Sequence, residues 1–103
     1  MDKGTDADRG LGHSSRLRRV EGIAWREIDG EAVLVNVRSD EVMHLNPAAS
    51  FLWSSLDGQA TLEEIARSMT GEFDVEADTA LADSVAFAAS LVEQGAAEVV
   101  ELE

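Results

Sequence analysis

The sequence predicts an α+β domain in which a three-stranded antiparallel sheet is followed by three helices on one side of it. Two observations carry this prediction. Short β-type runs with turn residues between them fill residues 23–45, and helical spacing of apolar residues with capping signals replaces them from residue 46 on. The 103 residues suffice for one domain, and their 45% hydrophobic content is that of an ordinary globular protein.

The predicted sheet begins with two β-type runs, residues 23–28 and 31–37. The Asp29-Gly30 pair between them predicts a tight hairpin, because a primed turn needs positive φ. A second turn at residues 38–40 leads into a third short strand. Alternation places Val42 and His44 on one face of this strand, and Glu41, Met43 and Leu45 on the other. It does not show which face packs against the core.

Three helices follow, each with its own start signal. Asn46-Pro47 is an N-cap followed by proline at the first helical position, and Asp57-Gly58 closes this helix. Thr61 opens a capping box with Glu64, and we expect this second helix to end at Gly71.

Asp74 is the expected cap of a third helix over about residues 75–94, with Gly95 after its end. The main apolar stripe of this helix is Ala77, Leu81, Val85, Ala88 and Val92. Residues 96–102 are expected to add a short terminal strand.

The distribution of charge excludes several functions. The net charge is −13, and residues 40–103 carry all of it, with Arg67 as their one base. Duplex nucleic acid and anionic membranes bind to basic surfaces, so this charge argues against both as partners. The absence of cysteine excludes disulfides and thiolate chemistry, and the sequence indicates a cytoplasmic protein. Residues 1–19 have few apolar groups and are predicted to be a disordered tail before a domain at residues 20–103.

No arrangement of residues predicts catalysis. His13 lies in the predicted tail and His44 is alone in a strand, so neither a metal site nor a histidine-based catalytic pair is indicated. The many carboxylates are spaced as solvated helix faces and loop edges, and no phosphate-binding glycine loop is present. We therefore expect a protein that is not an enzyme and that needs no cofactor.

The order and spacing of several short motifs resemble PqqD and its relatives, the recognition elements for ribosomally made precursor peptides (RREs). The resemblance covers about residues 22–98. It rests on the hairpin and on these segments: Val42-Met43-His44-Leu45-Asn46-Pro47-Ala48-Ala49, Leu52-Trp53, Leu56-Asp57-Gly58, Thr61-Leu62-Glu63-Glu64-Ile65-Ala66, and Asp83-Ser84-Val85-Ala86-Phe87-Ala88-Ala89-Ser90-Leu91 with Gly95 after it.

This resemblance implies a winged-helix-like fold and a binding function without chemistry. In such proteins the leader segment of a precursor peptide adds as a further antiparallel strand beside the third strand, with its side chains in a groove bounded by the third helix. The implied peptide-binding residues are Glu41, Val42, Met43, His44 and Leu45 on the strand, and Asp78, Leu81, Ala82, Val85, Ala86 and Ala89 on the helix. Several of the helix positions are alanines at spacings of three and four, which leave room for another chain.

Three functions remain as alternatives. The first is leader binding for a lasso peptide, with delivery to a separate cysteine peptidase and a cyclase. The second is a chaperone for the precursor peptide of pyrroloquinoline quinone, with a radical SAM enzyme as partner. The third is a general protein–protein adaptor. A DNA-binding winged helix is disfavoured because the helical half has one base, Arg67, to meet phosphates.

Overall fold

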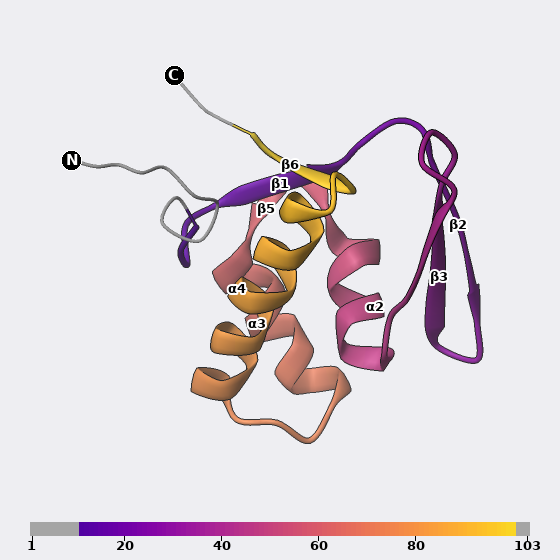
Figure 1. The fold of residues 1–103 in the computed structure, drawn as a ribbon. Helices are drawn as coiled ribbons and strands as arrows, with labels where there is room; N and C mark the ends of the chain where they lie inside the picture. Colours follow the sequence, from indigo (N-terminus) through magenta and orange to yellow (C-terminus); the bar gives the residue numbers. More distant parts are fainter. Residues whose placement is uncertain (1–10, 101–103) are drawn as a thin grey trace.

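The computed structural model describes residues 11–100, which form two small antiparallel sheets and three helices. Figure 1 shows the hairpin of residues 23–36 projecting beside the helix of residues 47–55, with the other two helices on the far side of that helix and the second sheet across the helix ends. The elements in chain order are β1 (Arg16–Arg19), β2 (Ile23–Ile28), β3 (Glu31–Asn36), β4 (Glu41–His44), α2 (Pro47–Ser55), β5 (Asp57–Thr61), α3 (Leu62–Glu72), α4 (Ala77–Glu93) and β6 (Ala97–Val100).

The predicted meander is confirmed as the sheet β2-β3-β4. Ile28 pairs with Glu31, so Asp29 and Gly30 alone form the loop, and their φ angles of 54° and 81° are those of a type I′ turn. β4 pairs with β3 through four residue pairs and lies at one edge of the sheet. The α+β class with three helices is therefore confirmed.

The first two helix starts are confirmed. The Asn46 side chain accepts a hydrogen bond from the Ala49 N–H at 2.8 Å, and Thr61 and Glu64 make both bonds of the capping box. The predicted stop of α3 at Gly71 is wrong. The helix continues to Glu72, and the next residue, Phe73, packs edge to face on Phe51 with ring centroids 5.9 Å apart.

The predicted cap of α4 at Asp74 is also wrong. The helix starts two residues later, with Glu76 in the cap position and no side-chain hydrogen bond there. Val75 is half-buried against the core, and this packing leaves Asp74 ahead of the first turn. The end of α4 is confirmed, because Gly95 has φ 79° and its N–H donates to the Val92 carbonyl at 3.0 Å.

The second sheet, in the order β5-β1-β6, is the main feature that the sequence did not indicate. Residues 1–10 of the predicted tail lie outside the described residues, and for residues 16–19 the tail prediction is wrong. β1 pairs with β6 over four residue pairs and with β5 on its other side, and Leu17 is 0% exposed. Backbone bonds to two neighbouring strands and the burial of this leucine order the segment despite its polar composition. The predicted terminal strand is confirmed as β6.

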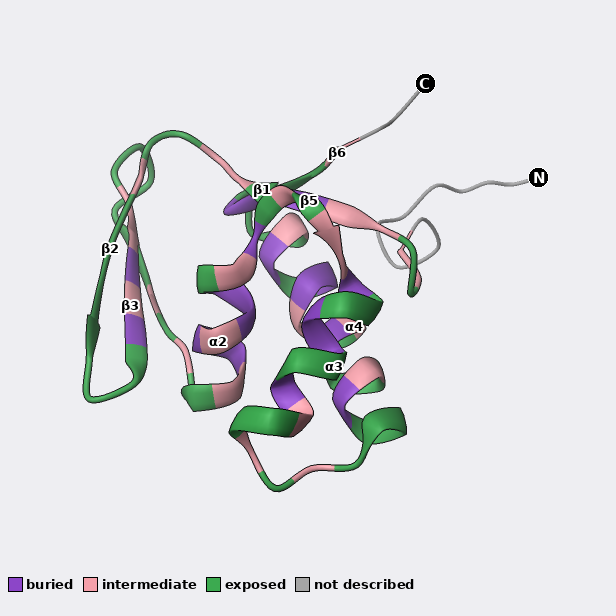
Figure 2. Cartoon of the chain, turned by 180° about the vertical axis from the view of Figure 1, so that it is seen from behind, coloured by how far each residue is buried: buried purple, intermediate pink, exposed green. Residues whose placement is uncertain are grey.

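The core lies between the helices and the inner face of β3, as the buried residues in Figure 2 show. Ser50 on α2 joins the hairpin sheet to this core. Its buried hydroxyl accepts from the Ala32 N–H at 2.7 Å and donates to the Leu45 carbonyl at 3.1 Å. Arg19 lies over the rings of Trp25 and Trp53, at 5.5 and 5.8 Å from their centroids. These contacts hold the β2-β3-β4 sheet against α2.

Candidate functional site

The outer edge of β4 is open: within residues 11–100 no strand pairs with it beyond β3. The Leu45 N–H donates to the Ala32 carbonyl at 2.9 Å, which sets the phase of the ladder. Because hydrogen-bonded pairs alternate in an antiparallel ladder, residues 41, 43 and 45 direct their backbone groups to β3. The N–H and C=O groups of Val42 and His44 consequently point to the open edge, where a further strand can pair with them.

A groove of about 320 Å³ runs beside this edge, between β4 and the C-terminal half of α4. Met43 and Leu45 are half-buried and pack against the core, which settles the face that the sequence left open. The opposite face is exposed, with Val42 at 53%. The groove is lined by Val42, Met43, His44, Leu45, Ala49, Phe87, Ser90, Leu91 and Gln94.

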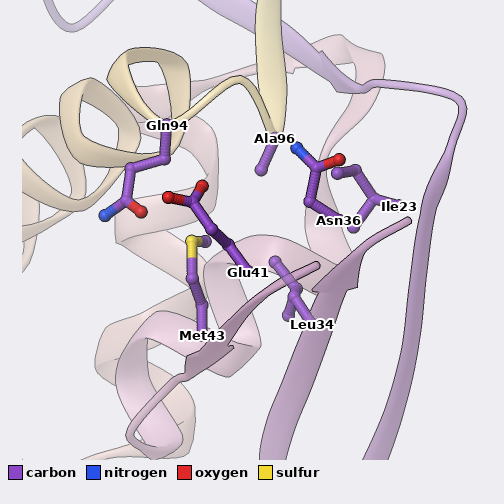
Figure 3. A pocket seen from close by; sticks show the side chains of 7 residues that line it. All are labelled: Ile23, Leu34, Asn36, Glu41, Met43, Gln94 and Ala96. Carbon is purple, nitrogen blue, oxygen red and sulfur yellow. The ribbon is translucent and has the colours of Figure 1, made fainter. Parts of the chain in front are cut away.

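A small apolar pit of about 10 Å³ lies next to the groove, at the start of β4. Met43 and Gln94 line both spaces. Figure 3 shows the Glu41 carboxylate and the Gln94 amide on the same side of Met43, with Ile23, Leu34, Asn36 and Ala96 completing the pit. Together the two spaces follow one face of residues 41–45, which carries the side chains of Glu41, Met43 and Leu45.

The structure brings the four predicted residues of β4, and Leu45 just after it, close to α4, but not to the face of α4 that was predicted. None of the predicted helix residues lines the groove: Asp78, Leu81, Ala82, Val85, Ala86 and Ala89. At about 3.6 residues per turn, these positions are centred roughly half a turn away from the lining residues. Ala89 is instead buried, and Ala82 and Ala86 are exposed.

Sequence reasoning missed Ser90 and Gln94, which line the groove and are both exposed. Neither residue carries a signal, because an exposed serine or glutamine on a helix is ordinary. Phe87 and Leu91 lie outside the predicted apolar stripe of the helix, and they supply the apolar wall of the groove. Spacings of three and four residues link the four lining residues of this segment, so they share one face of the helix: Phe87, Ser90, Leu91 and Gln94.

The chemistry of the groove is that of a binding surface. Its lining contains one imidazole, His44, and no lysine or arginine, and Glu41 lies at one end. Among residues 11–100, no group of three or more metal-binding side chains is found. Outside the groove, the Ala60 and Gln59 N–H groups donate to the Asp57 carboxylate and lower its pKa. No helix in the described part of the chain is long and apolar enough to cross a bilayer.

Solved structures with the same fold carry peptides. One, described as "Lasso peptide synthetase B1 complexed with the leader peptide", is 30% identical over 81% of this chain and 98% of that chain, with a TM-score of 0.71. Another, described as "TbiB1 in Complex with the TbiA(beta) Leader Peptide", is 25% identical over 79% of this chain and 94% of that chain, with a TM-score of 0.70.

The search of curated proteins found no match to this chain. At the level of families, residues 31–97 match the one described as "Coenzyme PQQ synthesis protein D (PqqD)". That match includes β4, α4 and every residue of the groove between them. The chain therefore belongs to the PqqD family, as a PqqD-like recognition element related to the B1 proteins of lasso-peptide synthesis.

Proposed function

We propose that this protein binds the leader segment of a ribosomal precursor peptide as an added strand on β4, with alternate leader side chains in the groove against α4. The observation that carries the proposal is the coincidence of an open strand edge with a groove beside it. Backbone hydrogen bonds to Val42 and His44 supply affinity, and the groove supplies specificity. An exposed sheet edge is a liability for a small protein unless something pairs with it.

The related solved structures support a lasso-peptide leader as the ligand, because both are complexes with a leader peptide and one is named as a lasso peptide synthetase component. In this role the protein is a cytoplasmic, non-catalytic component. It delivers the bound precursor to separate modifying enzymes, first a cysteine peptidase that removes the leader and then a cyclase.

The second candidate is the pyrroloquinoline quinone pathway, favoured by the description of the matching family. There the protein is a chaperone for a precursor that bears glutamate and tyrosine and is modified by a radical SAM enzyme. The two candidates share the β4 site and differ in the peptide. A general adaptor is the third candidate, and it requires no leader peptide at all.

The test is a fluorescence-polarisation titration with the leader encoded by the precursor gene next to this one. We expect a micromolar or lower Kd. In the informative variant, Val42→Pro, proline removes an N–H that faces the open edge, a position where a strand tolerates proline. Affinity should fall at least about tenfold, the equivalent of about 1.4 kcal/mol, because the added strand loses a backbone bond and meets the ring.

The matched control is Glu27→Pro on β2, the other edge of the same sheet. Ile28 bonds to Glu31 across the turn, so by alternation the Glu27 N–H also faces outward, but Glu27 does not line the groove beside β4. This variant should bind as the parent does. Failure of the leader to bind the parent protein overturns leader recognition in favour of the adaptor, and equal losses in both proline variants place the peptide elsewhere.

A further inference from the structure

Glu41 lies at the end of the groove, where it lines the adjoining apolar pit. It lies at the start of β4 on the same face as Met43, and Figure 3 shows its carboxylate beside the Gln94 amide at the mouth of the apolar pit. The other side chains around this mouth are neutral: Ile23, Leu34, Asn36, Met43 and Ala96. A single carboxylate therefore lies at one end of a groove that contains no other acidic side chain and no lysine or arginine.

No base of the described chain compensates this carboxylate. Glu41 accepts a hydrogen bond from the Ser39 hydroxyl at 3.3 Å, and it takes part in none of the ion pairs found among residues 11–100. The arginine nearest in sequence, Arg38, lines a different cavity together with Arg18 and Arg19. The carboxylate is exposed and free to meet a cation that arrives with a ligand.

We infer that Glu41 selects leaders with a lysine or arginine at the position opposite it. This inference rests on the proposed antiparallel addition to β4, which fixes the order of the side chains. Residues opposite Leu45, Met43 and Glu41 follow one another at every second position of the leader, and their side chains share the groove face. From its N-terminus, the leader therefore carries an apolar residue opposite Leu45, a second apolar residue two positions later opposite Met43, and a lysine or arginine two positions after that, opposite Glu41.

The pit explains why the cation belongs to a long side chain. At about 10 Å³ it holds roughly one water-sized group and cannot take a whole side chain. An aliphatic stem can cross its apolar mouth between Met43 and Ile23, while the charged end reaches the carboxylate in solvent. Lysine and arginine have this combination of stem and charge.

The experiment is a charge scan of the leader from the neighbouring precursor gene. Each residue in turn is replaced by lysine and by glutamate, and Kd is measured by fluorescence polarisation. One position, two residues after an apolar anchor, should favour lysine over glutamate by about three- to tenfold, since opposite charges attract across a strand pair and like charges repel. Glu41→Lys should invert the preference at that position alone.

The matched control is Glu31→Lys, which changes the net charge by the same amount on the outer face of β3. It should leave the preference at that position in favour of lysine. If the leader binds and no position responds to Glu41→Lys, or if both variants shift every position alike, the inference about Glu41 fails and leader recognition stands. If the leader does not bind the parent protein, the proposed function fails first.

Discussion

Single side chains decide much of the local geometry near the site. Asp57 is the clearest case, because its carboxylate accepts the Gln59 and Ala60 N–H groups at 2.8 and 2.9 Å and so shapes the turn that follows α2. The sequence marked Asp57-Gly58 as a helix stop, and the structure adds that the same residues start β5. One short segment thus ends a helix and supplies an edge of the second sheet.

The lowered pKa of Asp57 gives a pH prediction. Hydrogen bonds to the charged form stabilise the folded state only while the group is ionised. The contribution is therefore present above the ordinary aspartate pKa of about 4 and is lost as the pH falls through the lower folded value. Asp57→Ala should lower the melting temperature at pH 7, and this difference from the parent should shrink in strongly acid solution. A difference that stays constant over that range contradicts the assignment.

Ser90 gives a prediction about affinity. Ser90→Leu places a larger side chain in the groove, while leucine remains a good helix former. Leader affinity should fall about tenfold or more, because overfilling a packed groove costs about 1–3 kcal/mol, and the melting temperature should stay within a few degrees of the parent. Kd and thermal melts measure the two effects separately.

Two alanines of α4 serve as controls for that variant. Ala86 is exposed and away from the groove, so Ala86→Leu should change neither affinity nor stability. Ala88 is 0% exposed in the core, so Ala88→Leu should lower stability first. If Ala86→Leu weakens binding and Ser90→Leu does not, the peptide lies on the opposite face of α4, as the alanine spacing predicts.

At the scale of elements, the hairpin and the first two helix starts could be predicted because each depends on local signals. Each signal fixes backbone no more than four residues away: Asp29-Gly30 forms the turn, Asn46 caps α2 ahead of Pro47, and Thr61 with Glu64 caps α3. The strands of the second sheet could not be predicted. Arg16–Arg19 is ordered by pairing with residues at least 39 positions away (Arg18 with Asp57), and its own composition is that of a solvated segment.

The rotation of α4 also escaped prediction, for a physical reason. Its buried face includes the small residues Ala80, Ser84 and Ala88, because α3 packs closely against it, while the larger Leu81 and Val85 are only half-buried. The pattern of large apolar residues therefore points about a quarter turn away from the true core. The β4 side of the site could be predicted, because it depends only on the third strand and its position at the edge of the sheet, and both follow from the meander.

The ladder of β4 predicts a pattern of hydrogen exchange. Amides of Val42 and His44 face the open edge and should exchange fast in the free protein, whereas Met43 is already bonded to β3. Saturating leader should slow exchange at Val42 and His44 and change Met43 much less. Amide-resolved exchange by NMR measures all three. Unchanged exchange at Val42 and His44 despite full binding contradicts strand addition.

At the scale of the whole molecule, the charge is distributed unevenly along the chain. Residues 1–39 are neutral in sum, and residues 40–103, which include β4 and all three helices, carry the net charge of −13. A field of one sign over a large surface speeds the approach of an oppositely charged ligand. The protein should therefore favour leaders that carry lysine or arginine beside their apolar anchors.

This field makes the association rate dependent on salt. Raising ionic strength from about 10 mM to about 150 mM shortens the Debye length from about 30 to about 8 Å. The association rate constant should fall more than the dissociation rate constant rises, as measured by stopped-flow fluorescence. An association rate that does not depend on salt counts against electrostatic steering.

The open edge of β4 has a consequence for the behaviour of the protein in concentrated solution. An edge that accepts one extended peptide also accepts the same edge of a neighbouring copy, which is the first step of edge-to-edge aggregation. β4 is four residues long and begins with Glu41, and the net charge of −13 repels other copies. Colloidal stability and the proposed leader binding therefore depend on the same acidic groups, so acid or high salt should remove the repulsion that keeps β4 available for a peptide.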